Sequence, residues 1–130
     1  RRHRRGMQNY RKLKVWERAN DLAPRVRALT GTFPKRGYSS MKDQIHSAVE
    51  SIPFNIAEGC GTDSSKEFAR YLDIAVKSAC ELDAELHLAV GYDIVDRRVA
   101  AELTDEVEQI RRMLRALRKR VLASPADSSL

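Results

Sequence analysis

The sequence has few cysteines and no long apolar run, and both absences exclude classes of protein. Its two cysteines, Cys60 and Cys80, match no metal-binding or redox spacing, so we expect isolated packing thiols in a reducing compartment. No apolar stretch approaches the roughly 20 residues of a membrane-spanning helix. The basic start "RRHRRG" lacks the apolar stretch that would follow in a secretory signal. We therefore expect a cytoplasmic protein with no membrane partner.

The excess of basic charge is concentrated at the N-terminus. The formal net charge is +6, from 24 Lys and Arg against 18 Asp and Glu. Four arginines precede Met7, which resembles a natural start, and we expect the first six residues to be an added or upstream extension. Without these four arginines, 20 basic residues face 18 acidic ones. Composition alone therefore says little about a nucleic-acid partner, and the position of the charges matters more.

Core-type residues recur at alternating steps of three and four, which is the spacing of a helix buried along one face. This spacing predicts four helices, and no segment shows the sustained alternation with a period of two that favours a strand. The four series, in chain order, are Val15, Ala19, Leu22, Val26, Leu29 and Phe33; Met41, Ile45, Ala48, Ile52, Asn55 and Gly59; Phe68, Leu72, Ala75, Ala79, Leu82, Leu86 and Ala89; Ala100, Leu103, Val107, Ile110, Leu114, Leu117 and Val121.

Short connections between these series make successive helices antiparallel. Residues 10–122 are therefore predicted to form an all-α, up-down-up-down four-helix bundle. A flexible basic leader (1–9) precedes it and a disordered tail (123–130) follows it. Pro24 and Pro53 fall inside predicted helices, where proline removes one backbone hydrogen bond, and we expect a kink at each.

Polar residues at the predicted helix ends act as start and stop signals. Ser64, with Glu67 three residues later, has the spacing of a capping box before the third helix. Asp96 is the expected N-cap of the fourth helix, and Ser39 or Ser40 that of the second.

The stretch "SIPFNIAEGCG" (51–61) places Pro53, Asn55 and Glu58 inside a predicted helix, just before Gly59. Asn55 falls on the core series, so its amide needs a partner, such as the carbonyl freed by Pro53 or a group on a neighbouring helix. Glu58 lies near the helix C-terminus, where the helix dipole disfavours it, and we expect Lys66 or Arg70 to hold it. The helix is expected to stop at the glycine that follows. Packing and subunit contact explain this stretch better than direct ligand binding.

Three segments carry a resemblance to a known family. They are "LKVWERA" (13–19), "IPFNIAEGCG" (52–61) and "SSKEFARYLDIA" (64–75). The sequence from about Tyr10 to Val121 resembles the four-helix-bundle family that is also called the 23S ribosomal RNA intervening-sequence proteins. The positions that match are Val15, Trp16, Ile52, Pro53, Asn55, Ile56, Ala57, Glu58, Gly59, Phe68 and Leu72.

The resemblance implies a non-enzymatic bundle that assembles as a ring, commonly of five subunits. Some members are encoded inside ribosomal RNA genes. A distantly related group serves as nucleic-acid-binding accessory subunits of reverse transcriptases, so such an enzyme is a possible partner if the genome context supports it. Phe54 departs from the family because many members carry a small residue there, and His46 and Ser47 replace a pair that is often basic.

Catalytic and metal sites find little support in the residue spacing. Asp43 and His46 form one Asp-x-x-His pair, but His87 has Ala84 three residues before it, so a di-iron site lacks its second pair. The glycine-rich turn at 59–61 lacks phosphate-loop spacing. The acids Glu81, Asp83 and Glu85 are expected on an exposed or subunit-facing side of the third helix. We therefore predict no enzyme activity, no metal and no cofactor.

Basic residues gather at the two segments that share one end of the predicted bundle. Residues 111 to 120 contain six cations and no acid, and the helix dipole accounts for only two or three of them. We name this set the basic pole, and its members are Arg11, Lys12, Lys14, Arg111, Arg112, Arg115, Arg118, Lys119 and Arg120. It indicates a surface for RNA, DNA or another polyanion; the alternatives are ion pairs to acids of a neighbouring subunit and a merely solvated face.

Apolar residues beyond a single buried face predict self-association. They are Trp16, Ala23, Val49, Phe54, Ile56, Tyr71, Ile74 and Val76, of which Phe54, Trp16 and Tyr71 are the candidate interface residues. The expected function is a non-enzymatic, homo-oligomeric binding or scaffold protein that contacts RNA or DNA through the basic pole, and the family resemblance implies that the oligomer is a pentamer. The alternative is a purely structural protein-interaction module without nucleic-acid binding.

Overall fold

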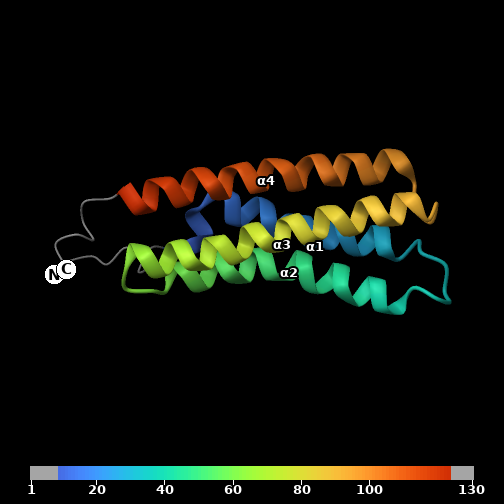
Figure 1. Cartoon of the computed structure of the whole chain (residues 1–130), viewed down its shortest axis with the longest axis horizontal. Helices are drawn as coiled ribbons and strands as arrows, with labels where there is room; N and C mark the ends of the chain where they lie inside the picture. Colours follow the sequence, from blue (N-terminus) through green and yellow to red (C-terminus); the bar gives the residue numbers. More distant parts are fainter. Residues whose placement is uncertain (1–8, 124–130) are drawn as a thin grey trace.

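Four helices form the fold of the computed structural model, which describes residues 9–123. After a short 3-10 helix, η2 (Tyr10–Lys12), come α1 (Lys14–Thr30), α2 (Ser39–Cys60), α3 (Ser65–Gly91) and α4 (Arg97–Ala123), and no strand occurs within residues 9–123. The four run alternately up and down along one long axis (Figure 1). The predicted all-α four-helix bundle is confirmed. Residues 1–8 of the expected leader and 124–130 of the expected tail lie outside the described residues.

Two of the predicted N-caps are present. The Ser64 side chain accepts a hydrogen bond of 3.1 Å from the Glu67 amide, and Asp96 accepts one of 3.0 Å from the Val99 amide. The prediction for α2 is wrong, because Ser39 is already helical and Tyr38 occupies the cap position. The Tyr38 ring packs at 6.3 Å from Phe33 and 6.0 Å from Tyr92, and this packing fixes the turn one residue before the first serine.

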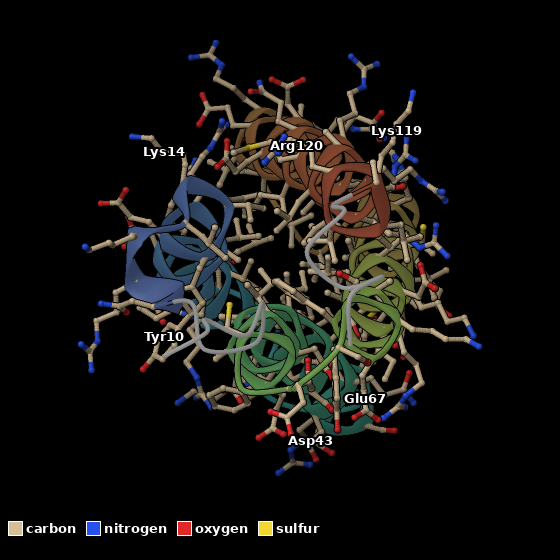
Figure 2. The ribbon with its side chains drawn as sticks, turned by 90° about the vertical axis from the view of Figure 1, so that its left-hand side faces the viewer. Tyr10, Lys14, Asp43, Glu67, Lys119 and Arg120 are labelled. Carbon is tan, nitrogen blue, oxygen red and sulfur yellow. The ribbon has the colours of Figure 1, made fainter. Side chains whose placement is uncertain are left out.

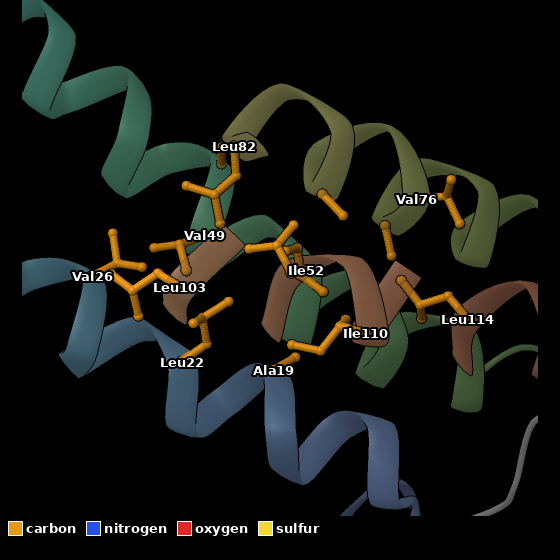
Figure 3. Packing of buried hydrophobic residues seen from close by; sticks show 14 of the residues in the cluster. Ala19, Leu22, Val26, Val49, Ile52, Val76, Leu82, Leu103, Ile110 and Leu114 are labelled. Carbon is orange, nitrogen blue, oxygen red and sulfur yellow. The ribbon is translucent and has the colours of Figure 1, made fainter. Parts of the chain in front are cut away.

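The core is built as predicted in α1, α3 and α4, where every residue of the three series is buried. Figure 3 shows members of all four helices meeting in the centre. Val49, Ile56 and Val76, expected beyond the edge of the core, are also buried. A bundle helix buries a face wider than one residue because it contacts two neighbours. These three residues therefore belong to the core and do not supply surplus apolar surface.

Helices α1 and α2 both continue through their prolines, Pro24 and Pro53, as predicted. The kink expected at each proline stays a prediction. The cysteines differ from one another: Cys60 is buried, and burial raises its pKa to about 11, whereas Cys80 is exposed. The expectation of a packing thiol is therefore right for Cys60 and wrong for Cys80, which lies on the outer side of α3.

A cross-helix ion pair holds α1 against α4. The Arg18 guanidinium donates to both carboxylate oxygens of Glu106, at 2.9 and 2.6 Å, and to Gln109 at 2.9 Å. These bonds raise the pKa of Arg18 and lower that of Glu106. A bidentate ion pair of this kind fixes the relative orientation of the two side chains as well as their distance. It sets the position of α1 relative to the middle of α4, and so helps to bring the start of α1 close to the end of α4.

Candidate nucleic-acid interface

The start of α1 and the second half of α4 lie side by side at one end of the bundle. Lys14 and Arg120 both line a small cavity of about 150 Å³ between them, together with Leu13, Val15, Met113, Ala116 and Leu117. Figure 2 views this end along the bundle, with Lys14 on α1 and Lys119 and Arg120 on the last turns of α4. The fold therefore brings together the two segments that the sequence assigned to the basic pole.

Three arginines of the basic pole are already paired with acids of the same chain. Arg111 donates to both oxygens of Glu108, at 3.0 and 2.7 Å, and Arg112 donates to the same carboxylate at 2.9 Å. These bonds hold the pKa of Glu108 below its ordinary value. Arg118 reaches across to α3, where its Nε lies 2.6 Å from Asp73. The positive charge of these three residues is therefore partly neutralised within the subunit.

The last turns of α4 carry the cations that stay unpaired. Arg115, Lys119 and Arg120 are exposed and have no ion-pair partner within residues 9–123. Arg115 and Lys119 are four residues apart, so they lie on the same face of the helix. We name these three residues the free cations of α4. Their side chains are available to an anion outside the subunit.

The N-terminal members of the basic pole, Arg11, Lys12 and Lys14, contribute less positive charge to the surface formed by the end of α4. Arg11 lies over the Tyr10 ring, with its guanidinium carbon 5.4 Å from the ring centre, and Lys12 is exposed. Lys14 is 3.9 Å from Glu17, and both side chains are largely exposed, so that ion pair contributes little. Lys14 adjoins the free cations of α4 through the cavity that it lines with Arg120, whereas Arg11 and Lys12 lie on η2, which contacts α1 and α2.

The stretch 51–60 at the end of α2 makes contacts that were not predicted from the sequence. Asn55 is half-buried, and its amide donates to the Ser51 carbonyl at 2.8 Å and to the Ser51 hydroxyl at 2.9 Å. Ser78 of α3 donates to that same hydroxyl at 2.8 Å, which ties α2 to α3. The predicted core position of Asn55 and its bond to the carbonyl freed by Pro53 are therefore wrong. A helix turns about 100° per residue, which leaves Asn55 beside the buried face.

Glu58 differs from its prediction as well. Its side chain is exposed and has no ion-pair partner among the described residues. Neither expected partner, Lys66 or Arg70, pairs with it: Arg70 lies 3.7 Å from Glu67 instead, and its guanidinium stacks 4.6 Å from the centre of the Tyr71 ring. Glu67 precedes Arg70 by three residues on the same helix, which makes it the nearer acid.

Gly59 is the residue of this stretch whose structural role is clearest. A Cβ atom there would lie 2.7 Å from a ring carbon of Phe68 and 3.2 Å from Cβ of Tyr71. Phe68 is fully buried, so its ring has no room to withdraw. The missing side chain is therefore what lets α2 approach α3 at the turn between them.

Replacing this glycine tests that packing. Gly59→Ala is expected to lower the free energy of unfolding by about 1 to 2 kcal/mol, because overpacking outweighs the gain in helix propensity. Gly91→Ala is the matched control, since nothing lies within 4 Å of its added Cβ. Urea unfolding compares the two. A Gly59→Ala protein at least as stable as Gly91→Ala would contradict the close contact.

The three candidate interface residues lie on three different helices and differ in exposure. Phe54 of α2 is 66% exposed. Trp16 of α1 is half-buried, with its ring 4.9 Å from that of Tyr10, and Tyr71 of α3 is half-buried beside Arg70. Other large apolar side chains are exposed and were not predicted from the sequence; they are Leu88, Tyr92, Val99 and Leu122.

The described residues contain no group of three His, Cys, Asp or Glu side chains placed to hold a metal ion. His46, considered above with Asp43, has its Nε2 at 2.7 Å from the Thr30 hydroxyl, and burial lowers the pKa of its ring. None of the described helices is long and apolar enough to cross a membrane.

Comparisons with known proteins agree with this fold. A solved structure from Bacteroides thetaiotaomicron, described as a protein of unknown function from the S23 ribosomal protein family, superposes with a TM-score of 0.74. It is 24% identical in sequence, and the match covers 81% of this chain and 98% of that one. A search of curated proteins finds no significant match. The sequence profile of the 23S rRNA-intervening sequence proteins matches residues 11–116. The chain belongs to the 23S rRNA-intervening sequence protein family.

Proposed function

We propose that the protein is a non-enzymatic, homo-oligomeric binding protein that contacts the phosphates of RNA or DNA through the free cations of α4. The observation that carries this proposal is the exposure of Arg115, Lys119 and Arg120 without an ion-pair partner among the described residues, in a stretch from 109 to 123 that contains no acid. Phosphate contacts of this kind position a protein on nucleic acid without reading its sequence. The family's description, which names an rRNA element, is consistent with such a partner.

Oligomerisation would strengthen these contacts. One subunit offers a small number of free cations, so a single copy is expected to bind weakly. A ring, commonly of five subunits in the family that the sequence resembles, repeats the same surface about one axis. Contacts that are weak individually then add as avidity on one polymer. The oligomer and the basic surface therefore belong to one proposal.

The salt dependence of binding tests this proposal. Protein that starts at Met7 is titrated into labelled single-stranded RNA and duplex DNA at about 50 and about 200 mM salt. Each neutralised phosphate releases counterions, so the affinity should fall steeply between these conditions. The trimmed start matters because "RRHRRG" alone could capture phosphate. Absence of salt-sensitive binding would leave the structural protein-interaction module, in which the cations pair with acids of a neighbouring subunit.

Phe54→Ala tests the interface. Because this ring is 66% exposed, its removal should barely change the stability of a monomer. It should weaken assembly, since a large exposed aromatic side chain is a typical interface anchor. Light scattering after size exclusion measures the mass, with Val99→Ala, 40% exposed on α4, as the matched control. An unchanged mass together with a large loss of melting temperature would show that Phe54 stabilises the subunit itself.

A further inference from the structure

A cavity lies at the end of the bundle opposite the basic pole, between the start of α2 and the last turns of α3. Its volume is about 330 Å³, near the lower end of the range for small-molecule sites. Polar, aromatic and aliphatic groups all contribute to its wall. The lining residues are Gly37, Tyr38, Ser40, Met41, Gln44, Glu85, Leu88 and Tyr92.

Glu85 is the unusual member of this wall. It is 9% exposed, and its Oε1 atom has no hydrogen-bond partner among the described residues. Burial, with a smaller contribution from the Glu81 carboxylate one turn earlier, raises the pKa of Glu85 to about 7. No cation lines the cavity, whose other polar groups are Tyr38, Ser40, Gln44 and Tyr92. A buried carboxylate without a partner is costly, and that cost is relieved when a cation reaches it.

The aromatic and aliphatic side chains of the cavity wall suit the apolar part of an organic cation. The rings of Tyr38 and Tyr92 lie 6.0 Å apart at a tilt of 52°, and aromatic faces attract organic cations. Tyr92 is 53% exposed and Leu88 is 49% exposed, so an apolar surface is open to solvent beside the carboxylate. Tyr92 and Leu88 line the same cavity as Glu85.

We propose that this cavity binds an organic cation, with an ammonium, amidinium or guanidinium group paired to the Glu85 carboxylate and an apolar part packed on Tyr92 and Leu88. The cation comes either from a free amine or from a Lys or Arg side chain of a second copy of this chain. The site is separate from the basic pole and does not depend on nucleic-acid binding.

Benzamidine and benzamide form the matched probe pair, because they share a ring and similar shape while only the first is charged. Binding is followed by NMR of the isotope-labelled chain, through shifts of the amides of residues 38–44 and 85–92. At about pH 8.5 benzamidine should bind at least 10-fold more tightly than benzamide. At about pH 5.5, where Glu85 is mostly protonated, its affinity should fall by about 30-fold. Equal binding of the two probes would overturn the proposal.

Two variants locate the site. Glu85→Gln should reduce benzamidine affinity at least 10-fold at about pH 8.5 and remove its pH dependence. Tyr92→Ala should reduce the affinity while keeping the pH dependence. Its ring is 53% exposed but packs on Tyr38, so the melting temperature of this variant is measured first to show that it folds. Binding that neither variant changes would place benzamidine elsewhere and overturn the proposal.

Light scattering with and without saturating benzamidine then assigns the source of the natural cation. If a Lys or Arg of a second copy occupies the cavity, benzamidine competes with it and the oligomer mass falls. If a free amine occupies it, the mass is unchanged. Either result supports the proposal only where Glu85→Gln lowers the affinity for benzamidine at least 10-fold. A fall in oligomer mass on adding benzamidine that persists in Glu85→Gln would contradict it.

Discussion

Reversal of the free cations of α4, as Arg115→Glu, Lys119→Glu and Arg120→Glu together, is expected to weaken binding to RNA and DNA by about 100-fold or more at low salt. The change removes three attractive contacts to phosphate and adds three repulsive charges. A 100-fold loss corresponds to about 2.7 kcal/mol, a modest share of what several phosphate contacts supply. The melting temperature should fall only modestly: all three side chains are exposed and unpaired within residues 9–123, although glutamates near the C-terminus of α4 are disfavoured by the helix dipole. Fluorescence anisotropy with labelled oligonucleotides measures the loss.

A second triple variant with the same change in net charge is the control. Arg36→Glu, Arg97→Glu and Arg98→Glu alter exposed residues at the opposite end of the bundle. Glutamate at the first turn of α4 is compatible with the helix dipole, so this variant should fold. It should retain most of the affinity. An equal loss in both variants would show that net charge governs binding and that no particular surface does.

Arg111 and Arg118 are unsuitable for such a reversal. Glutamate at either position would face Glu108 or Asp73, the acids that these arginines now pair with. Like charges at that distance would destabilise the contact between α3 and α4 or the α4 surface itself. A loss of binding in that variant would therefore not separate function from folding.

Glu85→Gln is expected to raise the free energy of unfolding by roughly 2 kcal/mol at about pH 8.5. The pKa of this carboxyl is about 7 in the folded chain, against 4.5 for an ordinary glutamate. Between these values the folded state binds more protons than the unfolded state, so this group makes the folded chain less stable as pH rises. Its favourable contribution is complete below about pH 4.5 and lost above about pH 7. Glutamine resembles the protonated acid and should remove this dependence.

Urea unfolding of both proteins at about pH 5 and about pH 8.5 measures this difference. Comparing variant with wild type at each pH cancels the other titrating groups, including Glu106, whose pKa is lowered by Arg18 and whose contribution runs in the opposite direction. Glu81→Gln is the control, because Glu81 is exposed and should have only a small effect. A Glu85→Gln protein less stable than wild type at about pH 8.5 would contradict the buried, unpaired state of this carboxylate.

The main features of the fold could be predicted because helical periodicity depends on each helix alone. The series in α1, α3 and α4 identify buried residues such as Leu22, Leu82 and Ile110. In α2 the spacing of three and four predicts the buried face incorrectly, because polar and small residues interrupt it. It places Asn55 in the core and leaves out Val49 and Ile56, which are buried. The width of the buried face depends on how neighbouring helices pack, which spacing along one helix does not specify.

The charged sites were harder to predict, for two different reasons. Glu108 stands three and four residues before Arg111 and Arg112, so these pairs follow from a spacing that the sequence already contained. The pair of Arg118 with Asp73 depends on the register between α3 and α4, which the sequence does not specify. Of the two expectations for Glu85, an exposed or a subunit-facing position, the exposed one is wrong: Glu85 lies three residues after Leu82 and four before Ala89, on the buried side of α3.

Photo-crosslinking of a bound RNA oligonucleotide, followed by mass spectrometry of the crosslinked peptides, shows directly whether RNA contacts the free cations of α4. We expect crosslinks on the peptides that contain Arg115, Lys119 and Arg120, with weaker ones on the segment from Arg11 to Lys14. Crosslinks confined to the opposite end of the bundle, around Arg97 and Arg98, would contradict it. So would the absence of any crosslink at protein concentrations where an RNA-binding control is saturated.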